Sequence, residues 1–131
     1  MNSAFALLLA VLLFGITTPL LRGDKPAPPT AEKKKIIFLA GKPSHGYGAH
    51  EHRAGSLLLA SQLNKHMGDQ LEAEVHTAKD WPANASVLEE ADAIVIYCDG
   101  GRRHMAYQHL EGLDLKLKEG CGLACLHYGV E

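Results

Sequence analysis

The residues best suited to chemistry gather in a glycine-rich loop, Gly41–Arg53, which contains His45, His50 and His52. Neutral imidazoles are good ligands for zinc and related divalent ions, and a catalytic zinc site needs three protein ligands and a water. His50 and His52 are therefore candidate metal ligands, with a divalent ion such as zinc as the candidate cofactor. On a strand or turn, His50 and His52 could chelate an ion from one side, whereas at the start of a helix side chains two residues apart diverge by roughly 200°. The spacing thus also fits histidines that bind no metal.

A second set of polar residues lies at Asp99–His104 and at His127–Tyr128. Histidine can exchange protons near neutral pH, and a carboxylate can assist it. We therefore predict that the catalytic residues are His45, His127 and Asp99. The predicted substrate-binding residues, which can contact sugar hydroxyls, an anionic group or a sugar ring, are Tyr47, Arg103, His104 and Tyr128, with Arg102 beside them. Each also has a structural explanation, such as capping a helix, fixing a turn or solvating the surface.

Three short apolar segments are typical of buried strands. They lie between polar or glycine residues and are rich in branched side chains, and the first two come directly before the two loops. These segments are Ile36–Ala40, Ala91–Cys98 and Gly122–Tyr128, and an alternating segment at Leu71–Thr77 predicts a strand near a sheet edge. Helical patterns fill the intervals. The longest runs from His52 to Gly68, and Leu59, Leu63 and Met67 form its predicted apolar stripe.

The alternation of strands and helices predicts an α/β fold: a flavodoxin-like three-layer parallel sheet with strand order 2-1-3-4. In this order the loops after the first and third strands face each other across a crevice, and His127 lies beside them at the end of the fourth strand. His45 and His127 are therefore expected to share this crevice. The apolar fourth strand lacks an outer neighbour, which leaves the sheet incomplete at one edge. We therefore expect residues 34–131 to be the N-terminal part of a larger domain, or to form a homo-oligomer through the open edge.

The N-terminal residues differ from the rest of the chain. Residues 1–22 are almost wholly apolar and predict a signal peptide or an N-terminal membrane anchor, and residues 23–33 form a proline-containing linker. Export to the periplasm or the extracellular space is expected, with membrane attachment only if this segment is not cleaved. The 131 residues carry a formal net charge of −2, which gives no indication of a nucleic-acid partner.

The three cysteines, Cys98, Cys121 and Cys125, lie in or beside apolar segments. Two interpretations stay open. They are buried free thiols that pack as small apolar side chains, or two of them, Cys98 and Cys125 on neighbouring strands, form a disulfide.

Four segments of this sequence resemble the ThuA-like (trehalose-utilisation) domain family, within the class I glutamine amidotransferase-like superfamily. The segments that carry the resemblance are Lys34–Gly46, His50–Gly55, Ala93–Gly101 and Gly122–Tyr128. The sequence looks most like the exported members common in planctomycete-type bacteria, which are often linked to carbohydrate breakdown. The resemblance covers the chain from about Lys33 onward and implies a fold that continues past Glu131.

The resemblance does not imply glutaminase chemistry. In glutamine amidotransferases the nucleophile is a cysteine on a sharp turn after a strand, whereas Cys125 lies inside the apolar segment, about two residues early for that turn. The leading hypothesis is an exported domain that acts on a carbohydrate or an oxidised sugar derivative by acid–base chemistry. The alternatives are a non-catalytic sugar-binding or interaction domain, and an inactive truncated fragment.

Overall fold

The structure is a computed structural model that describes residues 32–77 and 81–131. The predicted signal peptide or anchor and most of the predicted linker lie outside these residues. Among the residues that it does describe, no helix has both the length and the apolar character needed to cross a membrane.

The strands are β1 (Lys34–Ala40), β2 (Leu71–His76), β3 (Ala93–Tyr97) and β4 (Gly122–Leu126). The α-helices are α1 (His52–Met67), α2 (Ser86–Glu89) and α3 (Leu110–Lys118), and two short 3-10 helices follow the later strands, η1 (Gly101–Arg103) and η2 (His127–Val130). The predicted order of elements is confirmed. The fourth strand ends before His127 rather than including it, because the chain turns sharply there with a φ of 58°.

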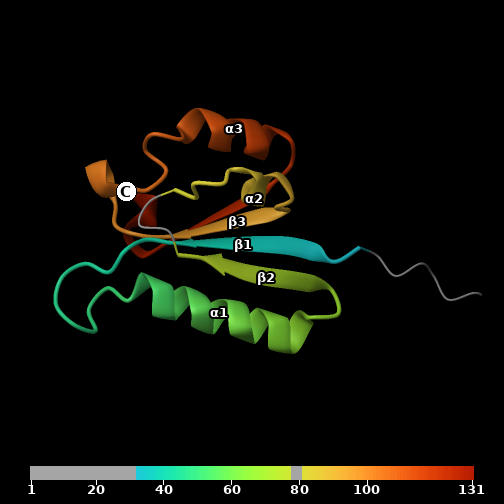
Figure 1. The fold of residues 1–131 in the computed structure, drawn as a ribbon, viewed down its shortest axis with the longest axis horizontal. Coiled ribbons are helices and arrows are strands. Elements are labelled where there is room, and N and C mark those ends of the chain that lie inside the picture. Colours follow the sequence, from blue (N-terminus) through green and yellow to red (C-terminus); the bar gives the residue numbers. More distant parts are fainter. Residues whose placement is uncertain (1–31, 78–80) are drawn as a thin grey trace, which may run out of the picture. The chain divides into compact units, whose positions relative to one another are not determined.

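The strands form a single parallel sheet in the order β2-β1-β3-β4, as predicted (Figure 1). Ile37 of β1 pairs with Glu74 of β2 on one side and with Ile94 of β3 on the other, and Ile94 pairs in turn with Leu123 of β4. Parallel strands with helical crossovers bring the carboxyl ends of β1, β3 and β4 to one edge of the sheet, where ligand sites of such folds lie.

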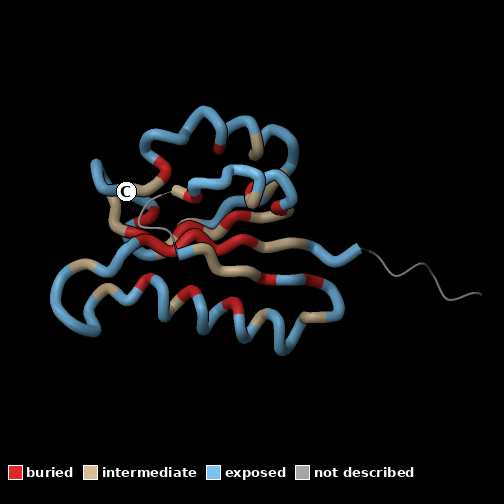
Figure 2. The backbone as a smooth tube through the Cα atoms, viewed as in Figure 1, coloured by how far each residue is buried: buried red, intermediate tan, exposed pale blue. Residues whose placement is uncertain are grey.

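Helices cover both faces of the sheet, with α1 on one face and α2 and α3 on the other (Figure 1). Ile37, Leu39, Ile94 and Ile96 are fully buried in the core beneath α2 and α3. Burial of each such side chain stabilises the fold by about 1.5–3 kcal/mol. A smaller core, which includes Phe38 and Ala60, lies beneath α1. Figure 2 shows that the buried residues concentrate in the central strands.

The apolar stripe predicted for α1 is wrong in part. The fully or nearly fully buried residues of this helix are His52, Ser56 and Ala60. Leu59 and Met67 are 43% and 38% exposed, and only Leu63 of the predicted stripe packs against the core. Small residues such as Ser56 and Ala60 face the sheet because α1 packs closely on it there. The neighbouring Leu57, Leu58 and Leu59 are exposed.

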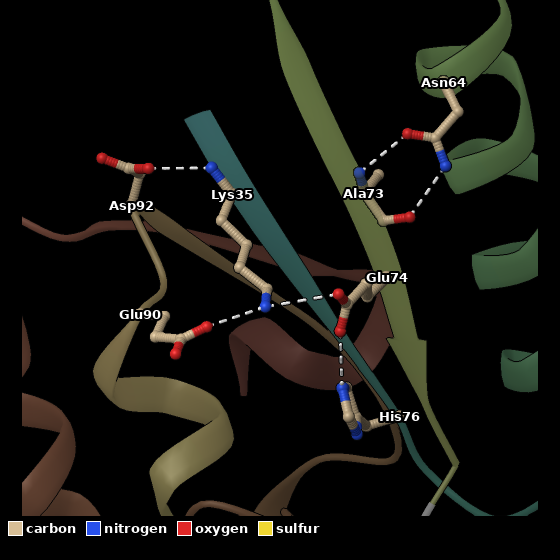
Figure 3. A network of polar contacts seen from close by, with 7 residues as sticks. All are labelled: Lys35, Asn64, Ala73, Glu74, His76, Glu90 and Asp92. Carbon is tan, nitrogen blue, oxygen red and sulfur yellow. Dashed lines mark hydrogen bonds and ion pairs between the residues drawn. The ribbon is translucent and has the colours of Figure 1, made fainter. Parts of the chain in front are cut away.

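Polar contacts hold the amino ends of β1 and β3 together and fix the outer strand β2 to α1 (Figure 3). The Asp92 carboxylate accepts hydrogen bonds from the Lys34 ammonium and the Lys35 backbone N–H, each at 2.8 Å. The Asn64 side chain of α1 donates to the Ala73 carbonyl and accepts from the Ala73 N–H, both at 2.8 Å. Asn64 thereby satisfies backbone groups of β2, which has no second neighbouring strand among the residues that the structure describes.

The opposite edge of the sheet, at β4, is open within the described part of the chain, as predicted. The first three residues of β4 are exposed although none of them is polar: Gly122, Leu123 and Ala124. Cys98, Cys121 and Cys125 are all free thiols, so the predicted alternative of a disulfide is not formed, but only Cys98 is buried and the other two are half-buried. Burial raises the pKa of each thiol.

Candidate functional site

Four histidines form a cluster at the carboxyl ends of the strands: His45, His50, His52 and His127, called here the histidine cluster. Gly41 allows the ends of β1 and β3 to approach, because a Cβ at this position would lie 2.7 Å from the Cys98 Cβ. Its N–H donates to the Tyr97 carbonyl at 2.9 Å. The loop then folds back through an antiparallel bridge between Ser44 and His50. Both predicted loops therefore meet at one place.

His50 is held by Ser44 and Asp99. The Ser44 hydroxyl lies 2.8 Å from the Asp99 Oδ1 and 2.9 Å from the His50 Nδ1, and the same Oδ1 lies 3.3 Å from that Nδ1. Because the carboxylate accepts hydrogen bonds, the His50 Nδ1 is engaged within the protein, and its Nε2 is free to act as a ligand or proton acceptor. This arrangement fixes both the orientation and the tautomer of an imidazole.

His52 is the most unusual residue of the site. It is fully buried, and its Nδ1 donates to the Lys42 carbonyl at 2.9 Å. Its Nε2 has no hydrogen-bond partner among the described residues, and neither does the Ser56 hydroxyl one helical turn further along α1. A buried polar atom without a partner costs about 1–3 kcal/mol. The nearest acidic oxygen is the Asp99 Oδ1, at 3.9 Å, which is too far for a hydrogen bond.

His45 and His127 lie on two sides of the His50 ring. The ring centroids of His45 and His50 are 4.2 Å apart, and those of His50 and His127 are 4.7 Å apart. Both predicted catalytic histidines have left-handed backbones, with φ of 61° at His45 and 58° at His127. Such a conformation costs a residue other than glycine roughly 1–2 kcal/mol and tends to occur at functional sites.

The histidines offer a set of metal ligands. Nitrogens of His50, His52 and His127 lie within 4.8 Å of one another, and a second group joins His45, His50 and Asp99 within the same limit. Nitrogens bound tetrahedrally to zinc at about 2.1 Å would be about 3.4 Å apart. The limit of 4.8 Å is wider than this spacing, so the imidazole rings would have to move closer together to bind an ion. The donors of the first group are all imidazoles, which suit zinc and similar transition metals.

Of the two arrangements considered for His50 and His52, the structure has the one in which His50 lies in a turn before the helix. Their ring centroids lie 5.7 Å apart. The reason is that α1 begins at His52, while His50 lies before the helix in the bridge with Ser44. The backbone between them therefore does not follow the helical rotation that would separate the two side chains.

Asp99 is an ionised carboxylate within the site. Its burial opposes ionisation, but hydrogen bonds from Ser44 and His50 and the nearby His52 hold its pKa below the ordinary value of 3.8. A carboxylate of this kind accepts hydrogen bonds and has little tendency to take up a proton near neutral pH. Its position suits the orientation of His50 better than proton transfer to a substrate.

The predicted substrate-binding residues lie in different places around the histidine cluster. Tyr128 packs against His127 with a centroid distance of 4.2 Å, and Tyr47 is fully exposed on the loop. Arg103 is exposed and lines a cavity beside Asp99. His104 donates from Nε2 to the Gly129 carbonyl and accepts at Nδ1 from the Ala106 N–H, each at 3.1 Å. Both of its nitrogens therefore bond to the protein backbone, and they join η2 to the loop between η1 and α3.

Sequence reasoning missed two residues of this site. Ser44 bridges His50 and Asp99, and Tyr97 packs against the His52 ring with a centroid distance of 5.0 Å. Their signals were a hydroxyl directly before His45 and an aromatic residue near the end of a buried strand. Those signals are weak because serine and tyrosine are common at such positions.

The sharp turn after β4 is made by His127, and Cys125 lies two positions earlier within the strand. Comparison of the chain with protein-family models, with curated proteins and with solved structures finds no match.

Proposed function

We propose that this chain is a ThuA-like domain whose histidine cluster binds a divalent transition metal ion, zinc being the first candidate, and acts on a carbohydrate or an oxidised sugar derivative by acid–base chemistry. The four sequence segments that resemble the family support the assignment. The parallel sheet with order β2-β1-β3-β4 is compatible with it.

The observation that carries the metal site is the state of the two inner histidines. The Nδ1 of His50 is engaged by Ser44 and Asp99, and the Nδ1 of His52 by the Lys42 carbonyl. Histidines that bind metals through Nε2 are usually oriented by such carboxylates and carbonyls on the other nitrogen. The buried Nε2 of His52, without a partner among the described residues, is then explained as a ligand.

In this proposal each residue has a definite role. His50, His52 and His127 hold the ion, and Asp99 with Ser44 orients His50. A divalent ion bound there would polarise a substrate carbonyl or hydroxyl oxygen. His45 is exposed beside His50 and is the residue that accepts a proton from the substrate and returns it, since its ring lies next to the ligands. Tyr128 and the exposed Tyr47 contact the sugar ring.

The reaction class that fits best is proton abstraction at a carbon next to a carbonyl group. His45 takes the proton from the C–H bond, the electron pair moves into the carbonyl to give an enolate, and a proton returned to carbon restores the ketone. Imidazole is suited to this transfer near neutral pH. Export and a carbohydrate substrate remain predictions from the N-terminal segment and the family resemblance.

Solvent exchange tests this function. The full chain, loaded with zinc, is incubated in D₂O with a panel of keto sugars, and proton NMR follows the loss of signals next to the carbonyl. Exchange that is slowed by His45→Ala, with unchanged sugar affinity, is the expected result. Saturable sugar binding with no exchange on any panel member would instead support a non-catalytic sugar-binding domain. His66→Ala, at the far end of α1, is the matched control.

A further inference from the structure

A cavity of about 420 Å³ lies next to the histidine cluster and is called here the basic pocket. Its charged lining residues are Lys42, Arg102, Arg103 and Asp99. Its size is typical of sites for small molecules. Because Asp99 both lines this pocket and contacts His50, a ligand in the pocket lies beside the histidines.

The three cations of the basic pocket have no anionic partner in the described part of the chain. Within residues 32–77 and 81–131, the side chains of Lys42, Arg102 and Arg103 form no ion pair or hydrogen bond with the protein. By contrast, the lysines of the sheet edge and of α3 are paired: Lys34, Lys35, Lys116 and Lys118. The whole chain carries a net charge of −2, so this local excess of cations does not reflect a basic protein.

Asp99 does not neutralise these cations. Its Oδ1 lies 2.8 Å from the Ser44 hydroxyl and 3.3 Å from the His50 Nδ1, and no ion pair joins it to a lysine or arginine of the described residues. The pocket therefore has unpaired positive charge beside a site that handles protons. Arginine presents a planar set of donors that matches the oxygens of carboxylates and of phosphate or sulfate groups.

The remaining wall is suited to a sugar. Tyr107 and Met105 supply aromatic and apolar surface, and Gln108 supplies an amide. The wall is held in place by His104, whose ring bonds to the Gly129 carbonyl and the Ala106 N–H. Aromatic surface with a few polar groups is a common composition of sites for small polar ligands.

We infer that the basic pocket binds the oxyanion of a negatively charged sugar and makes the histidine cluster selective for anionic over neutral carbohydrates. The shared chemistry is a carboxylate, phosphate or sulfate oxygen bound by Arg102, Arg103 and Lys42. This inference rests on the proposed function in taking the ligand to be a sugar. It adds the substrate class, which the histidines alone do not define.

Calorimetric titration of the full chain with glucose, glucuronate, glucose 6-phosphate and glucose 6-sulfate tests the inference. We expect at least one anionic sugar to bind at least 10-fold more tightly than glucose, and the best of the three identifies the oxyanion. The double substitution Arg102→Gln and Arg103→Gln should weaken that ligand roughly 10-fold to 100-fold and leave glucose unchanged. Lys65→Gln on α1 is the matched control, and affinity for the anion should fall with added salt.

Equal affinity for glucose and the anionic sugars, no binding of any of them, or no loss in the double variant would overturn the inference. An unchanged circular dichroism spectrum of that variant shows that it has folded. The titrations are done after chelation of metal, so they do not depend on the proposed function. Exchange on a neutral keto sugar without preference for anions would keep the proposed function and refute the inference. Preference for anions without any exchange would keep the inference and refute the proposed function.

Discussion

Substitution of His52 by phenylalanine should separate metal binding from folding. An aromatic ring is kept, although phenyl is larger than imidazole at this fully buried position, and the hydrogen bond from Nδ1 to the Lys42 carbonyl is lost, at a cost of about 0.5–1.5 kcal/mol. The substitution also removes the buried Nε2 without a partner, which relieves about 1–3 kcal/mol. These opposing terms leave the free energy of unfolding of the metal-free chain within about 2 kcal/mol of the original.

Zinc should then distinguish the two proteins. At a zinc concentration 100-fold above Kd, binding stabilises the original chain by about 2.7 kcal/mol. For a domain of roughly 100 residues this raises Tm by about 10–20 °C. Loss of an outer partner of a metal ligand weakens metal binding by up to roughly 100-fold. We expect loss of the direct ligand His52 to weaken zinc binding by about this upper value. The remaining stabilisation at the same zinc concentration is then about 0.4 kcal/mol, or roughly 2–3 °C.

The assay is thermal unfolding followed by circular dichroism, with and without zinc. His66→Phe introduces the same ring near the end of α1, away from the cluster, and should keep the full zinc-dependent increase in Tm. An equal increase in His52→Phe and the original chain would refute the reasoning, since the buried Nε2 would then not be a ligand.

Three further predictions concern the scaffold. Asn64→Ala should lower the free energy of unfolding in urea by about 1–2 kcal/mol, because both hydrogen bonds to Ala73 are lost; a loss below about 0.5 kcal/mol would contradict this, and Asn64→Asp should be intermediate. Gly41→Ala should destabilise by about 1–3 kcal/mol, because its Cβ would lie 2.7 Å from that of Cys98; an unchanged urea midpoint would show that the strand ends can separate. The hydrogen bond from Lys34, followed by that from the Lys35 N–H, lowers the pKa of Asp92 from 3.8. Its contribution to stability is therefore complete above that value and is lost as pH falls through the lower native pKa. The difference in stability between the original chain and Asp92→Asn should shrink over that acidic range, and a difference that is constant with pH would argue against the linkage.

The sheet could be predicted because its signals are local and agree with one another. The apolar segment Ile36–Ala40 is too short for a helix, and the segment before Asp99 is apolar on both faces, as expected of a central strand. Parallel connections then leave few arrangements of the strands. The same logic placed the loops that contain His45 and Asp99 at one edge, because the carboxyl ends of parallel strands meet there.

The details of the site could not be predicted in the same way. The contact between Ser44 and Asp99 joins residues 55 positions apart, and sequence periodicity does not report such pairs. The convergence of His50 and His52 depends on a single bridge before α1. The buried side of α1 was also missed, because Ser56 and Ala60 are selected by close packing against the sheet and not by hydrophobicity.

X-ray absorption at the zinc edge of the full chain, loaded with one equivalent of zinc, tests the central claim most directly. The account predicts three imidazole ligands at about 2.0–2.1 Å with a light fourth ligand and no sulfur. The same spectrum of His52→Phe should lose one imidazole. Sulfur at about 2.3 Å, or a first coordination sphere with no more than one imidazole, would contradict a metal site built from His50, His52 and His127.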